Sequence, residues 1–213
     1  MVIIIYFFVP SKTKELRCIS ILPDENFEII IDMMSEKIEI LRATPDDAQL
    51  ISELSAITFF NTFTGTCTDE DMQGFIEQYF NKNQVQSELQ DMNDFYFIAF
   101  VYGRAAGYIR IKDEVSDVEI INKHTAIELK RIYVLQEYHS KKVGAALMNF
   151  ALHFAAQKNY ELIWLGVWEH NERAKAFYKK FGFEDSGVEH PFPIGNTPQT
   201  DVWLYKFIGK GTL

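Results

Sequence analysis

Two segments of the chain carry residue types whose spacing could do chemistry. The first, residues 128–148, reads ELKRIYVLQEYHSKKVGAALM and predicts a strand that leads through a short turn into a helix. The first turn of that helix is expected to hold Ser140, Lys141, Lys142 and Gly144. Free backbone N–H groups at a helix start bind anions, lysines add attraction for phosphate, and glycine lets a ligand or a strand approach closely. The alternative is an ordinary strand-turn-helix connection with solvated lysines.

The second segment, residues 164–183, reads WLGVWEHNERAKAFYKKFGF. Asn171 suits the N-cap of a helix, and Gly182 suits the cap at its C-terminal end. Tyr178 follows Asn171 by seven residues, so both side chains share one helix face. A phenol and an amide that face one cleft could position a thioester and protonate a leaving thiolate. The alternative is that Tyr178 is an aromatic core residue.

The elements that must position these segments follow one another without an internal repeat or a low-complexity linker. Thr44 and Pro45 are typical of a helix start, and Gly103-Arg104 is typical of a hairpin turn. The predicted strands are 38–41, 95–102, 105–112, 126–135, 162–168, 183–188 and 202–207, and the predicted helices are 44–60, 68–80, 83–91, 143–157 and 171–180. This order predicts an α/β protein with a mixed central sheet flanked by helices.

Length and composition restrict the class of protein. With 213 residues, of which 47% are hydrophobic, the chain can form one domain, or one domain and an appendage, without a disulfide or a metal. The net charge of −9 disfavours nucleic-acid binding and favours cationic partners. No apolar stretch approaches the ~20 residues of a membrane helix, so no membrane partner is expected.

Cysteine and histidine usage indicates a reducing compartment and no metal site. The only cysteines, Cys18 and Cys67, do not form a CxxC pair. The five histidines show no metal-ligand spacing. We therefore expect a cytoplasmic protein.

Residues 1–34 are interpreted as an N-terminal extension of unknown role, and residues 35–213 as the functional domain. Residues 2–9 form an unbroken apolar run, but no basic residue precedes it and no small-residue cleavage site follows, so a secretory signal is not expected. A short strand or a disordered apolar tail is the simpler interpretation. Met33 and Met34 stand just before the domain, so the preceding residues could also be upstream sequence carried by an early start codon.

In their order and spacing, the two segments together resemble the GNAT superfamily of acetyl-CoA-dependent N-acetyltransferases. The turn is similar to that family's Gln/Arg-x-x-Gly-x-Gly/Ala motif, although His139 stands at the Gln/Arg position and Lys142 at the first glycine. Lys142 could still place its N–H on a pyrophosphate if its backbone φ is helical, with weaker cofactor binding as the expected cost. The resemblance covers about residues 37–208. The family's second signature is matched by Asn171-x-x-Ala174-x-x-Phe177-Tyr178-x-x-x-Gly182-Phe183.

Within the superfamily, four further features resemble the bacterial Pai-type polyamine (spermidine/spermine) N-acetyltransferases. They are Ile127-Glu128-Leu129-x-Arg131-Ile132-Tyr133-Val134, Trp164-Leu165-Gly166-Val167-Trp168-Glu169, the pair His190-x-Phe192, and Gln199-Thr200-Asp201. This resemblance implies acetyl transfer to a primary amine of a small cationic acceptor, with a polyamine as the expected one. The alternatives are acetylation of a protein N-terminus or lysine, and a catalytically weakened acetyl-CoA-binding regulatory protein. Dimers are frequent in the family, so a homodimer is compatible with it.

The resemblance also implies a splayed strand pair at the acetyl-CoA site, and no metal. The strand at residues 132–134 would pair its backbone with the pantetheine arm, and the turn after it would hold the pyrophosphate. The implied cofactor-binding residues are Ile132, Tyr133, Val134, His139, Ser140, Lys141, Lys142, Val143, Gly144, Ala145 and Asn171.

The implied chemistry is direct attack of a neutral amine on the thioester. A backbone N–H near Val134 would polarise the carbonyl, and Tyr178 would protonate the leaving sulfur. Many family members keep a glutamate five residues before the signature asparagine, where this chain has Gly166. The expected base is therefore Glu128, acting through water. The alternative for Glu128 is a surface acid at a strand end.

Acidic residues on or near the second predicted helix, which lines the acceptor groove in this family, could attract a polyamine. They are Asp69, Glu70, Asp71 and Glu77. The alternative is that the first three cap and charge the helix start. Aromatic residues of the same region could pack against a methylene chain or belong to the core, and they are Phe59, Phe60, Phe63 and Tyr79.

Overall fold

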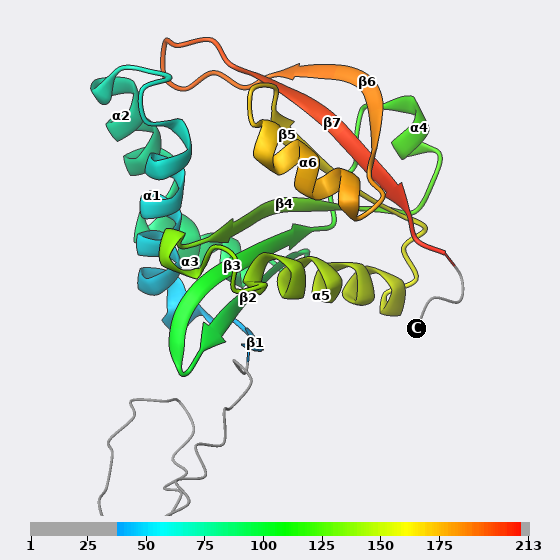
Figure 1. Ribbon diagram of the computed structural model, residues 1–213, viewed down its shortest axis with the longest axis horizontal. Coiled ribbons are helices and arrows are strands. Elements are labelled where there is room, and N and C mark those ends of the chain that lie inside the picture. The colour runs from blue at the N-terminus through cyan, green and yellow to red at the C-terminus, as the bar shows by residue number, and fades with distance from the viewer. Residues whose placement is uncertain (1–37, 210–213) are drawn as a thin grey trace, which may run out of the picture.

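Residues 38–209 are described by a computed structural model, in which helices cover both faces of one central sheet (Figure 1). The expected extension at 1–34 lies outside these residues. Within the described range, no helix is long and apolar enough to cross a membrane.

A seven-stranded sheet organises the domain in the order β1-β2-β3-β4-β5-β7-β6. Every neighbouring pair is antiparallel except β4 and β5, which run in parallel, so the predicted mixed sheet is confirmed. The strands are β1 (Ile38–Arg42), β2 (Asp94–Val101), β3 (Arg104–Lys112), β4 (Ala126–Val134), β5 (Leu162–Trp168), β6 (Glu184–Pro191) and β7 (Thr200–Phe207).

The helices expected from apolar periodicity are all present. They are α1 (Ala48–Phe63), α2 (Asp69–Tyr79), α3 (Lys82–Gln90), α5 (Val143–Gln157) and α6 (Glu172–Lys180). Single 3-10 turns precede α1 and α5, at Pro45–Asp47 and Gln136–Tyr138. The structure adds the short helix α4 (Glu119–Asn122), which sequence analysis missed because four residues contain too little of the helical repeat to be recognised.

Side-chain caps fix where the helices around the site begin. The Thr68 hydroxyl accepts a hydrogen bond from the Asp71 N–H at 3.1 Å, which sets the start of α2. The Asn171 side chain accepts one from the Ala174 N–H at 3.0 Å, which sets the start of α6. Both caps are of the type predicted from sequence, since short polar side chains satisfy the free N–H groups of a first turn.

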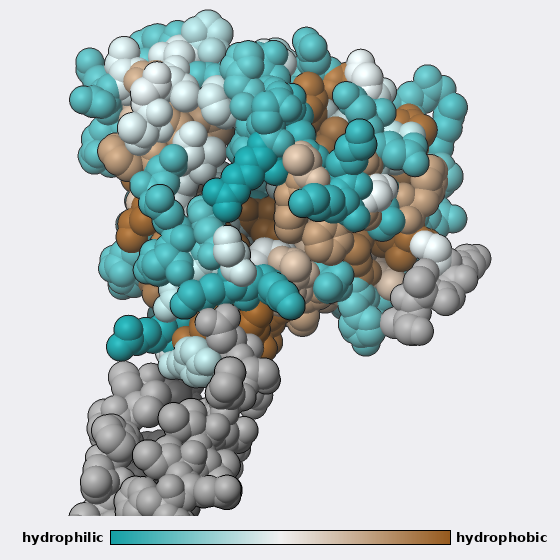
Figure 2. All heavy atoms as spheres, viewed as in Figure 1, coloured by the Kyte–Doolittle hydropathy of each residue, from teal (hydrophilic) through white to brown (hydrophobic). Residues whose placement is uncertain are grey.

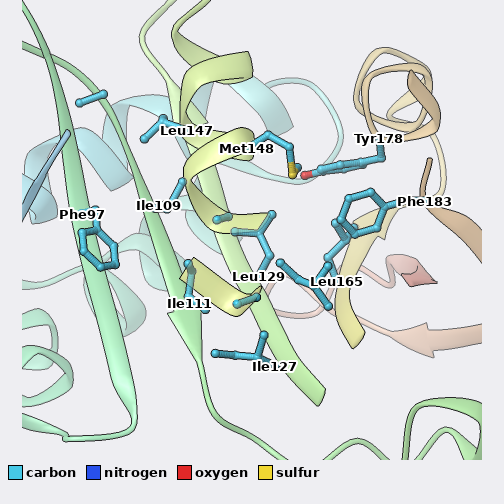
Figure 3. Close-up of a cluster of buried hydrophobic side chains, with 14 of the residues drawn as sticks. Phe97, Ile109, Ile111, Ile127, Leu129, Leu147, Met148, Leu165, Tyr178 and Phe183 are labelled. Atoms are coloured by element: carbon cyan, nitrogen blue, oxygen red, sulfur yellow. The ribbon is translucent and has the colours of Figure 1, made fainter. Parts of the chain in front are cut away.

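Apolar layers on both faces hold the sheet in place. On one face α5 and α6 pack, and Figure 3 shows Leu147 and Met148 of α5 beside strand residues such as Ile109 and Leu165. On the other face α1 and α3 pack against β2 and β3. Each fully buried aliphatic or aromatic side chain contributes roughly 1.5–3 kcal/mol, so the sheet is a firm support for the residues at its centre.

The parallel strands β4 and β5 stay paired only over their first residues. Three residue pairs join them, the last being Glu128 with Trp164. Next to this point β4 contains a β-bulge, because Leu129 and Arg131 pair with consecutive residues of β3 and leave Lys130 between them. A bulge bends a strand and increases its twist, which favours the separation. The splayed pair implied by the family resemblance is therefore present.

Candidate active site

A cleft of about 1510 Å³ opens where β4 and β5 part. Its walls come from α1 and α2, from the start of α5, from α6 and from the loop between β6 and β7. Figure 2 shows apolar residues in a hollow between the α1–α2 side and the α5–α6 side, with polar residues along its rim. Every predicted catalytic or cofactor-binding residue lines the cleft except Lys141, whose ammonium lies 5.2 Å from the centre of the Tyr138 ring.

The turn from β4 into α5 has a backbone that differs from the expectation. Ser140 and Lys142 have φ angles of 69° and 62°, and α5 begins at Val143. Residues 140–142 therefore precede the helix instead of forming its first turn, and the φ of Lys142 is left-handed, not helical. Glycine adopts this conformation most readily, which gives a physical reason for the glycine of the family motif at this position.

Gly144 lies in the first turn of α5 and has space around it. A Cβ added there would come no nearer than 3.8 Å to the side chains of Phe177 and Val134, which is ordinary contact. Of the two reasons expected for this glycine, the close approach of a neighbouring strand is therefore wrong. Close approach of a ligand stays a prediction.

The start of α5 can bind an anion. Ala146 donates its N–H to the carbonyl of Lys142 at 2.9 Å, so the N–H groups of Val143, Gly144 and Ala145 precede that first bond of the helix. All three residues line the cleft. Arg173, which sequence analysis did not single out, lines the same cleft from α6. Free N–H groups with cationic side chains nearby fit the phosphates of a nucleotide-like ligand.

The edge of β4 that faces the opening has one free backbone donor and one occupied acceptor. The N–H of Leu135 donates to the carbonyl of Ala106 at 2.9 Å, so the N–H of Val134 points the other way, into the space that β5 leaves. The carbonyl of Val134 lies 3.0 Å from Nε2 of His139. A ligand in the opening could thus accept a hydrogen bond from Val134, while His139 already engages the carbonyl.

Asn171 and Tyr178 face the cleft from α6, as predicted. The cap uses only Oδ1 of Asn171, which leaves its amide N–H groups for a ligand. Tyr178 is 8% exposed, belongs to the apolar core and points toward Met148 of α5 (Figure 3). Burial raises the pKa of Tyr178 well above its ordinary value, and the charge of Asp201 raises it further. The phenol therefore stays protonated at neutral pH and can act as a proton donor.

Glu128 lies at the last residue pair before β4 and β5 part. It is 6% exposed, so the alternative that it is a surface acid is wrong. Its carboxylate lies 2.9 Å from the ammonium of Lys130, which also lies 3.0 Å from Glu114. Burial raises the pKa of Glu128 to about 7, although the charge of Lys130 opposes this rise. A carboxyl that titrates near neutral pH can act as a proton acceptor.

Two arginines that reach the cleft are neutralised inside the protein. Arg110 pairs with Glu88 at 2.9 Å and with Asp94 at 2.5 Å, while Arg131 lies 3.4 Å from Glu88. The Tyr96 hydroxyl donates a further hydrogen bond to Glu88. Buried charges are tolerated when they are paired and hydrogen-bonded in this way, so this cluster serves the fold and does not make the cleft an anion site.

The acids near α2 do not line the cleft. Instead, Asp71 accepts hydrogen bonds from the Asn196 N–H at 3.0 Å and from the Thr197 hydroxyl at 2.8 Å, and these bonds lower its pKa. They fasten the β6–β7 loop to α2, and Figure 1 shows that loop reaching across to the helix. Asp69 and Glu70 lie in the first turn of α2, where their negative charges interact favourably with the helix dipole and stabilise the helix. Their expected place in an acceptor groove is therefore corrected.

Aromatic rings form two walls of the cleft. On the β5–β7 side, Trp164 stacks on Trp203 with ring centres 4.7 Å apart, and His190 lies edge-on to Trp203 at 5.3 Å. Nε1 of Trp164 is buried without a hydrogen-bond partner among the described residues. On the α1–α2 side the lining rings are Phe59, Phe63, Phe75, Tyr79 and Phe80, whereas Phe60 faces away and is half-exposed. The sequence offered one signal for the first wall, namely the tryptophans of the 164–168 segment.

A parallel strand pair that parts beside a helix start, with a protonated phenol and a buried carboxyl at the opening, is the arrangement expected of an acyl-CoA-dependent transferase. The chain belongs to the acetyltransferase (GNAT) family, whose model matches residues 57–183. It is therefore an N-acetyltransferase that uses acetyl-CoA, and the family resemblance drawn from the two sequence segments is confirmed.

Relatives and solved structures support the same assignment. An uncharacterised N-acetyltransferase in the pepI 3′ region of Lactobacillus delbrueckii subsp. lactis is 31% identical over 169 residues, which are 79% of this chain and 96% of the relative. A spermidine N(1)-acetyltransferase from Thermoplasma acidophilum is 28% identical over 151 residues, or 69% of this chain and 88% of the relative. The crystal structure of PaiA N-acetyltransferase from Thermoplasma acidophilum, in complex with coenzyme A, shares the fold. Its TM-score is 0.65 at 22% identity, over 80% of this chain and 99% of that one.

Proposed function

We propose that the protein transfers acetyl from acetyl-CoA to a primary amine of a small cationic acceptor, specifically a polyamine. The observation that carries this proposal is the β5–β7 wall of the cleft, where the half-buried ring of Trp203, stacked on the buried Trp164, accompanies the carboxylates of Glu128 and Asp201. Alkylammonium groups are attracted both by the faces of aromatic rings and by carboxylates. The similarity to a spermidine N(1)-acetyltransferase supports the same class of acceptor.

The opposite wall suits the apolar parts of such an acceptor. A polyamine alternates ammonium groups with short methylene segments, and rings such as Phe63 and Tyr79 of α1 and α2 can cover the methylenes. The net charge of −9 would raise the concentration of a polycation near the protein. One extended molecule could therefore use both walls of the cleft at once.

For the acetyl donor, we assign the backbone and cationic groups on the α5 side of the cleft. The exposed backbone edge at residues 132–134 would pair with the pantetheine arm, and the amide of Asn171 would bond to it from α6. The N–H groups of residues 143–145 would hold the pyrophosphate, with the charges of Lys142 and Arg173 nearby. The His139 ring already engages the carbonyl of Val134. We therefore expect Val134 to bind the pantetheine arm through its backbone N–H alone.

The reaction would proceed by direct attack. The acceptor arrives as an ammonium ion, and water would pass one of its protons to Glu128, because only a neutral amine can attack the thioester carbonyl. The Val134 N–H would stabilise the negative charge that develops on the carbonyl oxygen. The carbon–sulfur bond then breaks, and Tyr178 would protonate the leaving thiolate.

We further propose a cytoplasmic location, which suits the free thiol of Cys67. A homodimer stays a prediction from the family resemblance. Neither proposal affects the chemistry of the cleft.

Release of free CoA from acetyl-CoA, followed by thiol detection, tests the proposed function. The panel comprises spermidine, spermine, simple diamines, amino acids and a short peptide with a free N-terminus. We expect the polyamines to give the highest kcat/KM, and added salt to lower it because the attraction is electrostatic. Preference for the peptide would instead support N-terminal acetylation. Thermal stabilisation by acetyl-CoA without turnover of any amine would indicate a binding protein.

A further inference from the structure

Asp201 of β7 lies in space that Gly166 of β5 leaves open. A Cβ added to Gly166 would lie 3.0 Å from the Oδ2 atom of Asp201, so a side chain at position 166 would press on the carboxylate and shift it by a few tenths of an ångström. In the sheet register Asp201 pairs with Trp168 on one side and with His190 on the other, and it lines the cleft. The carboxylate is therefore placed by two neighbouring strands beside the opening in the sheet.

Asp201 differs from the other acids that line the cleft in having no ion pair among the described residues. Glu88 pairs with Arg110, Glu114 and Glu128 pair with Lys130, and Glu172 pairs with Lys175. The carboxylate of Asp201 also accepts no hydrogen bond from another residue of this part of the chain. A partly buried carboxylate without a partner is costly, which favours a role for it with a bound molecule or a proton.

Titratable groups from three elements interact electrostatically with Asp201 or pair with it in the sheet. Tyr178 of α6 and Tyr133 of β4 are close enough for the charge of Asp201 to raise their pKa values, and His190 of β6 is its register partner. Burial raises the pKa of Asp201 to about 6. Asp201 is thus largely ionised at neutral pH, and it lines the same cleft as Tyr178.

Acetylation of an ammonium ion requires two protons to leave the nitrogen. In the proposed function, on which this inference rests, the first passes to Glu128 and on to solvent before the nitrogen attacks. Once the nitrogen–carbon bond has formed, the nitrogen still carries a second surplus proton. This proton must leave as the carbon–sulfur bond breaks and the amide forms. An acceptor near the leaving sulfur can take this proton directly and restore the proton that Tyr178 has just given up.

We propose that Asp201 is a further catalytic residue, which accepts the second proton from the acceptor nitrogen and returns it to the Tyr178 phenolate. The nitrogen–carbon bond forms, the carbon–sulfur bond breaks, and the proton reaches the sulfur by way of Tyr178. The products are the acetylated amine, CoA as the free thiol, and one proton released to solvent. No oxidant, reductant or further co-reactant is required.

The variant Asp201→Ala with added sodium formate tests this role. We expect kcat for spermidine to fall about 100-fold, the usual contribution of one general base, while acetyl-CoA binding is retained. Because Gly166 has no side chain, the deleted carboxylate leaves room for formate, which should restore part of the rate. Asp201→Asn fills the same room with an amide, so it should lose as much activity without rescue. A residue with a purely structural role would not respond to formate.

Glu189→Gln is the matched control. Glu189 lies on β6 next to His190, is exposed and does not line the cleft, so its loss should leave kcat unchanged. The inference is overturned if Asp201→Ala keeps the parent rate, or if it melts like the parent and formate restores nothing. Should Asp201→Ala not fold, Asp201→Asn decides: a parent-like kcat overturns the inference and a large loss in kcat supports it. Absence of turnover by the unmodified protein with every amine would instead refute the proposed function, and the inference with it.

Discussion

Replacing Lys142 by glycine should stabilise the protein. The φ of Lys142 is 62°, a left-handed conformation that costs a residue with a Cβ roughly 1–2 kcal/mol. Part of the gain is lost because glycine is freer in the unfolded chain, by roughly 0.4–1 kcal/mol. The net increase in the free energy of unfolding should be about 0.5–1 kcal/mol, and Tm should rise by roughly 1–4 °C for a domain of this size.

Lys142→Ala is the control that isolates the backbone effect. It removes the same charge and the same flexible chain but keeps a Cβ at the same φ, so it should be no more stable than the parent. Urea denaturation and thermal melting of the parent and both variants measure the difference. Equal stability of the alanine and glycine variants would refute the argument that left-handed strain resides at this position.

The same pair of variants tests what Lys142 does for acetyl-CoA. Both variants lose the lysine charge, so a comparison between them removes the electrostatic contribution. Glycine holds the left-handed turn without strain. We therefore expect the glycine variant to bind acetyl-CoA at least as tightly as the alanine variant, with a Kd that is no higher in calorimetry. A higher Kd for the glycine variant would mean that a stiff turn contributes more to acetyl-CoA binding than relief of backbone strain does.

Three further variants probe other parts of the site. Tyr178→Phe should lower kcat about 100-fold and leave acetyl-CoA affinity unchanged in calorimetry, since only the proton donor is lost. Loss of binding would instead make Tyr178 structural. Because burial raises the pKa of Glu128 to about 7 and only its carboxylate accepts a proton, kcat should fall as the pH drops below that value. Glu128→Gln should have low activity and lose the transition near pH 7, keeping only one near pH 6, the raised pKa of Asp201, whereas a surviving transition near pH 7 would assign it to another group. Asp71→Ala should release the loop at 194–199, lower Tm and raise KM for the amine but not for acetyl-CoA, whereas unchanged proteolysis of the loop would refute that role.

Elements built on local rules could be predicted from the sequence. The helix expected at 143–157 is Val143–Gln157, and the strand expected at 126–135 is Ala126–Val134. Apolar repeat and cap residues are properties of neighbouring positions, so they can be read along the chain. The left-handed φ of Lys142 could not be predicted in this way. This φ angle arises where the 3-10 turn after β4 joins α5. It therefore depends on how the sheet and α5 pack against each other, which neighbouring residues in the sequence do not reveal.

Contacts between distant strands explain what sequence analysis missed at the site. Asp201 reaches Gly166 only through the β5–β7 register, and Trp203 reaches Trp164 in the same way. The position of Gly166 within an otherwise bulky strand was the available signal, because a strand glycine often marks the close approach of another group. Asp71 shows the opposite case. The family resemblance, in which this helix lines the acceptor groove, suggested a ligand role for it, whereas its partners are Asn196 and Thr197 of a loop that is remote in sequence.

The parting of β4 and β5 explains how the groups of the site can meet at all. Side chains alternate across a strand, and Leu129, Leu165 and Leu204 face the α5–α6 layer, so Glu128 and Asp201 face the opposite side. Tyr178, on α6, belongs to the α5–α6 layer. In a continuous sheet the phenol and the two carboxylates would be separated by a layer of hydrogen-bonded backbone. Where the pairing stops, at Glu128 and Trp164, that barrier ends, and one cleft is lined from both sides. The bulge at Lys130 is therefore as important to the proposed chemistry as the reacting groups, because the opening begins beside it.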